Sequence, residues 1–156
     1  MIDVIILAAG QGSRMRSTKP KVLHEIGGKP MVNHVVDAAL CLPDVSLHLV
    51  VGHGSEAVQA SLTTPCHIVE QKEQLGTAHA VLQALPNLSP NAKVLILYAD
   101  VPLIDAETLQ RMVNAVDSHC MAVLTTELDD ATGYGRIVRS DMGAVTDIVE
   151  HKDATQ

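Results

Sequence analysis

The chain has 156 residues, of which 47% are hydrophobic and 19% charged, and its formal net charge is -7. This composition is that of a globular domain, and no apolar run approaches the roughly 20 residues that a membrane-spanning helix needs. The negative charge and the lack of Phe and Trp argue against a nucleic-acid-binding protein. With no signal peptide and no Cys-x-x-Cys pair, Cys41, Cys66 and Cys120 predict reduced, partly buried thiols in a cytoplasmic protein.

Strand-like and helix-like patterns alternate up to about residue 126. Short apolar runs predict five strands, at residues 4–7, 46–51, 67–70, 93–98 and 121–126. Helical spacing predicts helices over residues 30–41, 55–62, 76–85 and 105–117, with Ser55 or Gly54 capping the second and Asp105 the fourth. Residues 136–139 and 145–149 then predict a hairpin. This order predicts an α/β protein with an open, mostly parallel Rossmann-like sheet, which binds ligands at the carboxyl ends of its strands.

The segment after the first predicted strand combines glycines with cations. It reads Ile5-Ile6-Leu7-Ala8-Ala9-Gly10-Gln11-Gly12-Ser13-Arg14-Met15 and continues to Lys19-Pro20-Lys21. Gly10 and Gly12 allow positive φ and close approach of a ligand to the backbone, while Arg14 and Lys21 supply charges for phosphate oxygens. A dinucleotide fingerprint would need glycine in place of Met15, and no Walker motif occurs. The two glycines alone fit an ordinary turn with exposed cations equally well.

Asp100 follows the predicted strand at residues 93–98. A carboxylate at the carboxyl end of a central strand faces the ligand crevice, where it can bind a divalent metal. The alternative is that Asp100 caps the Val-Pro turn after it.

A polar loop, Gln71 to Gln74, leads through Leu75 to Gly76-Thr77 at the start of the third predicted helix. A glutamine amide can pair with the donor and acceptor edge of a pyrimidine, and a helix N-terminus offers free N–H groups. The alternative is a polar loop with a helix cap.

Two further segments stand near the end of the chain. Thr132-Gly133-Tyr134-Gly135-Arg136 has the composition of a hairpin turn, and Val149-Glu150-His151-Lys152 that of an exposed charged end. The eight histidines show neither His-x-His nor His-x-x-x-His spacing, so they predict packing or surface residues and not a zinc site.

Together these segments resemble the sugar-phosphate nucleotidylyltransferases, and most closely the uridylyltransferase domain of the bacterial bifunctional N-acetylglucosamine-1-phosphate uridylyltransferases. The resemblance covers essentially the whole chain. It implies the nucleotide-diphospho-sugar transferase fold, Mg²⁺ as cofactor, and UTP and N-acetylglucosamine 1-phosphate as substrates. The products would be pyrophosphate and UDP-N-acetylglucosamine, a precursor of peptidoglycan and lipopolysaccharide.

The resemblance also implies roles for particular residues. Arg14 and Lys21 would contact the phosphates as catalytic residues, and Asp100 would bind the metal. The residues expected to contact nucleotide or sugar are Leu7, Ala8, Ala9, Gly10, Gly12, Lys21, Gln71, Gly76, Thr77, Tyr98, Ala99, Asp100, Gly135 and Glu150. Within this set, Gly135 and Glu150 would hold the amino sugar. Ala99 stands where the family usually has glycine, and its methyl group is expected to crowd the site slightly.

The family pattern continues beyond these 156 residues, through a sugar-contacting Glu-Ile-Asn-Thr-Gly segment, a second metal-ligating Asn and a trimeric acetyltransferase β-helix domain. We therefore expect residues 1–156 to be the N-terminal portion of a MobA-like NTP transferase domain, with a truncated sheet, UTP binding and impaired turnover. Two alternatives stay open: a nucleotidylyltransferase for another base or acceptor, and a non-catalytic nucleotide-binding module.

Overall fold

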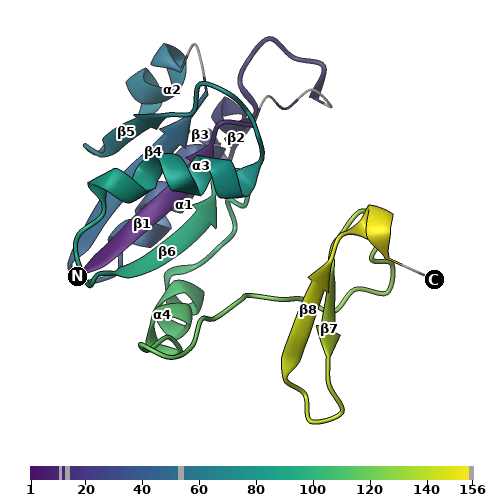
Figure 1. The fold of residues 1–156 in the computed structure, drawn as a ribbon. Coiled ribbons are helices and arrows are strands. Elements are labelled where there is room, and N and C mark those ends of the chain that lie inside the picture. The colour runs from purple at the N-terminus through teal and green to yellow at the C-terminus, as the bar shows by residue number, and fades with distance from the viewer. Residues whose placement is uncertain (11, 13–14, 53–54, 155–156) are drawn as a thin grey trace. The chain divides into compact units, whose positions relative to one another are not determined.

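A computed structural model describes the chain except for residues 11, 13–14, 53–54 and 155–156. The chain forms two compact units, Met1–Ala122 and Val123–Gln156 (Figure 1). Outside the undescribed positions, no helix combines the length and apolar character that crossing a bilayer requires.

The first unit is built on a four-stranded parallel sheet with the order β5-β4-β1-β6. Its strands are β1 (Ile2–Ala8), β4 (Val45–Val51), β5 (His67–Glu70) and β6 (Lys93–Tyr98). All seven residues of β1 are buried, and the strand pairs along both edges, with Ile5 opposite His48 and Ile96. A strand covered on both faces must be apolar throughout, which explains the continuous hydrophobic run near the N-terminus.

Helices cover both faces of this sheet. They are α1 (Met31–Leu40), α2 (Glu56–Ser61), α3 (Thr77–Ala84) and α4 (Ala106–Asn114). Val32 of α1 and Leu109 of α4 share one core cluster with Val4 and Ile6 of β1. Ala80 and Ala84 of α3 pack in a second cluster, with Ile5 and Leu7. Because alternate residues of β1 enter different clusters, the sheet separates two cores, and the predicted α/β class with a parallel central sheet is confirmed.

The element predictions hold closely up to residue 114. Each of the first four predicted strands exists, and Asp105 caps α4 by accepting a hydrogen bond from the Thr108 backbone at 2.7 Å. Ser55 precedes α2 without a side-chain capping bond, and Gly54 lies outside the described residues. The helix predicted to reach about residue 117 ends earlier, at Asn114.

The fifth predicted strand is wrong. Residues 121–126 are irregular, and Met121 and Leu124 expose 79% and 58% of their surface. Apolar and β-branched residues favour a strand only where a neighbour takes up the backbone hydrogen bonds. Here the boundary between the two units falls inside the segment, after Ala122. The segment is therefore a connection between the units. Its apolar character predicted a strand, but no strand of the described chain pairs with it.

The second unit is the predicted hairpin. Strand β7 (Arg136–Arg139) pairs antiparallel with β8 (Val145–Val149), with a register shift between Val138 and Arg139. A short 3-10 helix, η4 (His151–Asp153), follows it. Arg136 donates to the carbonyl oxygens of Ala131 and Tyr134, which closes the turn before β7.

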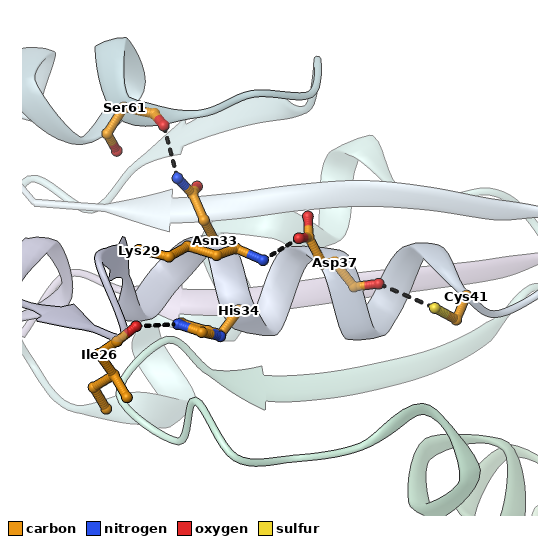
Figure 2. A network of polar contacts seen from close by, with 7 residues as sticks. All are labelled: Ile26, Lys29, Asn33, His34, Asp37, Cys41 and Ser61. Atoms are coloured by element: carbon orange, nitrogen blue, oxygen red, sulfur yellow. Dashed lines mark hydrogen bonds and ion pairs between the residues drawn. The ribbon is translucent and has the colours of Figure 1, made fainter.

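Polar contacts fasten the segment after the glycine-rich loop to α1 (Figure 2). The short strands β2 (Glu25–Ile26) and β3 (Lys29–Pro30) connect to α1 through an ion pair between Lys29 and Asp37 and a hydrogen bond of 2.9 Å from His34 to the Ile26 carbonyl. On the same helix, Asn33 donates to the carbonyl of Ser61 at the end of α2. These contacts hold the chain just beyond the 3-10 helix η2 (Lys21–Leu23).

The three cysteines are free thiols in the structure. Only Cys66 is half-buried, and its burial raises the pKa of its thiol. Cys41 and Cys120 are exposed, so the expectation of partly buried thiols is wrong for these two.

A buried carboxylate lies within the central strand. Asp3 is fully buried, and its oxygens accept hydrogen bonds from the Ser89 backbone at 2.6 Å and from the His48 ring at 3.2 Å. Burial by itself would raise the pKa of this carboxyl, but the bonds from Ser89 and His48 outweigh it, and the pKa of Asp3 lies below its usual value of 3.8. The carboxylate therefore stabilises the fold above about pH 4, and this stabilisation is lost as the pH falls through the lowered pKa.

We expect Asp3→Asn to lower the free energy of unfolding at pH 7 by about 1–3 kcal/mol. The NH2 group of the asparagine would replace one of the two accepting oxygens and would leave the donor that faces it without an acceptor. Urea unfolding at pH 7 and pH 3 measures the effect. The loss should be smaller at pH 3, where the unfolded wild-type chain takes up a proton at this position. Equal losses at both pH values would show that the ionised form of Asp3 does not stabilise the fold.

Candidate functional site

A pocket of about 250 Å³ opens at the carboxyl ends of β1 and β6. Three parts of the first unit line it: the ends of the two strands with the residues that follow them, the loop from β5 together with the first turn of α3, and the start of η2. The lining residues are Leu7, Ala8, Ala9, Gly10, Lys21, Val22, Gln71, Gln74, Gly76, Thr77, Ala80, Tyr98 and Asp100. This is the edge of a parallel sheet at which ligands bind.

Two opposite charges meet in this pocket. The Lys21 ammonium lies 2.5 Å from a carboxylate oxygen of Asp100, and about a third of each side chain is exposed. Lys21 opens η2, whose next residues Val22 and Leu23 are buried, whereas Asp100 follows β6. Residues 79 positions apart in the chain are therefore held together by two anchored elements. Because each charge neutralises the other, the pair is balanced as long as no ligand separates it.

The backbone of Gly12 explains why glycine is needed beside Lys21. Its φ is +60°, and a Cβ atom there would lie 2.6 Å from Cβ of Lys21. Gly12 therefore meets both criteria for glycine, a left-handed conformation and a close approach. Gly10 meets neither, because its φ is outside this region and a Cβ atom would find no neighbour within 4 Å. The expectation of positive φ thus holds for Gly12 and is wrong for Gly10, whose open surroundings leave space in the pocket.

The Gln71 side chain is a buried part of the pocket wall. It is 3% exposed, and its backbone N–H donates to the Val51 carbonyl at 2.8 Å. Its side-chain nitrogen lies 3.1 Å from the Gly76 carbonyl oxygen and 3.0 Å from Nδ1 of His79. Gly76 has a φ of 101° and directly precedes α3, so this turn brings the helix start back onto the glutamine. The amide is therefore held in a defined orientation.

The structure brings most of the predicted residues of the first unit to this pocket, with three exceptions. Gly12 is not among the lining residues, although it lies against Lys21. Arg14 lies outside the described residues, so its role stays a prediction. Ala99 is fully buried, and its side chain belongs to the hydrophobic core with Val22 and Leu97. The expectation that its methyl group crowds the site is wrong, because that group points into the core.

Gly135 and Glu150 belong to the second unit. Arg136 pairs with Val149 in the hairpin, so Gly135 before β7 and Glu150 after β8 lie at the same end of it. A Cβ atom on Gly135 would lie 3.5 Å from the Val149 carbonyl oxygen. The two residues predicted to hold one sugar are thus neighbours within their unit, and that role stays a prediction.

The sequence reasoning missed several residues. Val22 and Ala80 line the pocket, and His79 contacts Gln71 although the histidine spacings predicted only packing or surface positions. A signal existed for Ala80, since residues four apart share a helix face and Gly76 was already a candidate. Gln74 stood in a motif without a predicted role and also lines the pocket.

Asp100 can bind a divalent metal ion together with a substrate. Among the described residues, no group of three or more His, Cys, Asp or Glu side chains could hold a metal ion without other ligands. A single accessible carboxylate nevertheless fits Mg²⁺, which is commonly bound by one or two carboxylates together with substrate phosphates and water. Asp100 is an accessible carboxylate of this kind, paired with Lys21, and its metal-binding role stays a prediction.

The fold and the pocket define an α/β domain with a ligand site at the carboxyl ends of its parallel strands. The family model for the MobA-like NTP transferase domain matches residues 4–147, and the chain belongs to this family. It is thus a nucleotidyltransferase domain, as the sequence indicated.

Individual relatives refine this assignment. The chain is 58% identical over 156 residues to the bifunctional protein GlmU of Cellvibrio japonicus, covering 99% of this chain and 34% of the relative. It therefore spans about a third of the length of the curated relatives it matches.

Solved structures share the fold. A UDP-glucose pyrophosphorylase complexed with UDP-glucose matches with a TM-score of 0.76 and 22% identity, over 99% of this chain and 72% of that one. Rv0371c of Mycobacterium tuberculosis H37Rv, in complex with manganese, matches with a TM-score of 0.61 and 24% identity, over 72% of this chain and 57% of that one.

We expect Gly12→Ala to weaken binding of a nucleoside triphosphate by about tenfold or more, because the new methyl group would displace Lys21. The matched control is Gly27→Ala. Gly27 has nearly the same φ, +59°, but a Cβ atom there would meet nothing within 4 Å. Thermal unfolding should show destabilisation in both variants, larger in Gly12→Ala because of the added clash, while isothermal titration calorimetry should show the binding loss in Gly12→Ala alone. Equal affinities of the two variants would disprove the steric explanation.

Proposed function

We propose that this chain contributes the UTP-binding part of an enzyme that transfers a uridylyl group to N-acetylglucosamine 1-phosphate. The products are UDP-N-acetylglucosamine and pyrophosphate. The observation that carries the proposal is the 2.5 Å contact between Lys21 and Asp100 in a pocket that also contains Gln71. One site thus offers a cation for phosphate, a carboxylate for a metal and an amide for a base. The similarity to proteins named GlmU supports this choice among nucleotidyltransferases.

The reaction requires no nucleophile from the protein. A phosphate oxygen of the sugar phosphate forms a bond to the α-phosphorus of UTP, the bond from that phosphorus to the bridging oxygen breaks, and its electron pair leaves with pyrophosphate. The enzyme must hold two anionic substrates in line and offset their charge. In this scheme Lys21 leaves Asp100 and binds phosphate oxygens, with Arg14 as a second cation. Asp100 would hold Mg²⁺, which would supply positive charge to the triphosphate.

Other residues position the substrates. Gln71, Gly76 and Thr77 contact the base and nucleotide, and the backbone of Leu7 to Gly10 follows the nucleotide along the end of β1. In the second unit, the Glu150 carboxylate and the Gly135 backbone hold the amino sugar. The enzyme acts in the cytoplasm and supplies UDP-N-acetylglucosamine to peptidoglycan and lipopolysaccharide synthesis. Longer proteins of this kind would carry the acetyltransferase domain and form trimers.

We expect Lys21→Met and Asp100→Asn each to lower kcat/KM for UTP by about 100-fold or more, since each removes a charge that the reaction uses. Pyrophosphate release, measured at several Mg²⁺ concentrations with N-acetylglucosamine 1-phosphate as acceptor, separates the two roles. Asp100→Asn should raise the Mg²⁺ concentration needed for half-maximal rate, and Lys21→Met should mainly raise KM for UTP.

Lys19→Met is the matched control. Lys19 lies two residues before Lys21 and pairs with the exposed carboxylate of Glu25 at 3.4 Å, away from the pocket lining. This variant should retain wild-type kinetics. If Lys21→Met and Asp100→Asn also retained them, the pocket could not be the site of uridylyl transfer.

Titration with UTP, CTP and GTP in the presence of Mg²⁺ tests the choice of base. The wild-type protein should prefer UTP, and Gln71→Ala should reduce that preference by roughly tenfold, because the amide that reads the base is lost. Equal binding of all three nucleotides by the wild-type protein would favour another nucleotidyltransferase. Strong binding without any product, even when the segment that follows in the longer relatives is supplied, would favour a nucleotide-binding module.

A further inference from the structure

His79 contacts the one buried amide in the pocket wall and is itself outside the pocket lining. It lies in the first turn of α3, half-buried, with its Nδ1 atom 3.0 Å from the side-chain nitrogen of Gln71. The other ring nitrogen, Nε2, lies 3.1 Å from the amide nitrogen of Gln83, one helical turn further on. A chain of three polar side chains thus runs from the helix surface to the pocket.

The Gly76 carbonyl determines which end of the Gln71 amide faces the helix. A carbonyl oxygen can only accept, so the amide nitrogen, and not its oxygen, must lie at the observed 3.1 Å from it. One N–H then points to Gly76. The second N–H of the same group points to His79, because Nδ1 is the other atom within hydrogen-bond distance of this nitrogen, at 3.0 Å.

This arrangement selects one form of the histidine ring. Nδ1 can accept from Gln71 only if it carries no proton, so the proton of the neutral ring lies on Nε2. The Gln83 amide nitrogen also donates to the His79 carbonyl oxygen, over a long distance of 3.4 Å. A half-turn of the Gln83 amide gives up this long bond and presents the amide oxygen to the Nε2–H at the 3.1 Å position. In the opposite tautomer, an N–H of His79 would face an N–H of Gln71, and the two donors would repel each other.

The consequence for the pocket concerns the Gln71 oxygen. With both N–H groups engaged, Oε1 is the polar atom of this side chain that is left for a ligand, and no residue in the described part of the chain donates to it. Uracil has an N–H group at ring position 3, whereas cytosine has an acceptor nitrogen there. A fixed acceptor at this point of the pocket favours the first base and repels the second.

We propose that His79 is a positioning residue that locks the Gln71 amide with its oxygen toward the base and so makes the site selective for uridine over cytidine nucleotides. The inference rests on the proposed function, because it needs Gln71 to face the base. Without the Nδ1 acceptor, only the bond to the Gly76 carbonyl holds the amide in this orientation, so a turn that presents its nitrogen to cytosine costs less free energy.

The test compares the dissociation constants of UTP and CTP, measured by calorimetry with Mg²⁺, in the wild-type protein and three variants. His79→Phe keeps a ring but removes the acceptor, and the ratio of CTP to UTP dissociation constants should fall by roughly tenfold or more. His79→Asn places an amide oxygen near the position of Nδ1 and should restore most of the ratio. Leu82→Ala, at an exposed position on the same helix, should leave the ratio unchanged.

A merely structural role for His79 gives a different pattern. Loss of packing would weaken the binding of both nucleotides by the same factor, lower the melting temperature and leave the ratio of dissociation constants unchanged. That result would overturn the inference. The proposed function would still stand if the wild-type protein preferred UTP. If the wild-type protein bound both nucleotides equally, the proposed function and the inference would fail together.

A direct measurement on the unaltered protein does not depend on how the variants fold. Nitrogen chemical shifts of His79 distinguish the two tautomers, and we expect the proton on Nε2 in the neutral ring, both before and after UTP is added. A proton on Nδ1 in either state would overturn the inference.

Discussion

The position of the site depends on one constraint, the complete enclosure of β1. This strand is hydrogen-bonded along both edges, to β4 and β6, and its side chains enter cores on both faces of the sheet. Shifting its register by one residue would exchange the residues of the two cores. The position of the end of β1 relative to β4 and β6 is therefore fixed. The glycine-rich loop starts from that place, beside the end of β6 and the turn that starts α3. The ends of β1 and β6 and the start of α3, which lie far apart in the sequence, are therefore brought together by the packing of the sheet.

Enclosure of β1 also explains why a charge can be tolerated inside it. Asp3 accepts from a backbone N–H and a histidine ring, so its charge is compensated by groups that are themselves fixed by the sheet and by the chain at Ser89. The polar contacts of α1 have the complementary role on the surface, where they fasten the short β2–β3 hairpin and the end of α2. The core thus sets where the pocket lies and anchors η2, which carries Lys21, through Val22 and Leu23, whereas the peripheral contacts hold the chain just beyond η2.

The sequence predicted the elements of the first unit well because their signals are local. An apolar run such as Ile5 to Leu7, or an aspartate such as Asp105 before a helix, needs no information about distant residues. The strand predicted at residues 121–126 failed because pairing is a property of two segments and only one was visible in the pattern. The same distinction applies to the pocket. Lys21, Asp100 and Gln71 were recognised from motifs, whereas the direction of the Ala99 methyl group and the contact of His79 with Gln71 depend on the packing of the folded chain.

The pairing of Lys21 with Asp100 has a thermodynamic consequence. As long as the ammonium and the carboxylate satisfy one another, either a cation or an anion entering alone must break their contact and leave one charge uncompensated. When a cation and an anion bind together, the carboxylate pairs with the cation and the ammonium with the anion. The free energy needed to separate Lys21 from Asp100 is then spent once for two binding events. The affinities for the two ligands are then coupled. Because this coupling is reciprocal, the factor by which the metal ion raises the affinity for the nucleotide equals the factor by which the nucleotide raises the affinity for the metal ion. A balanced pocket of this type discriminates in favour of the metal–nucleotide complex over either component.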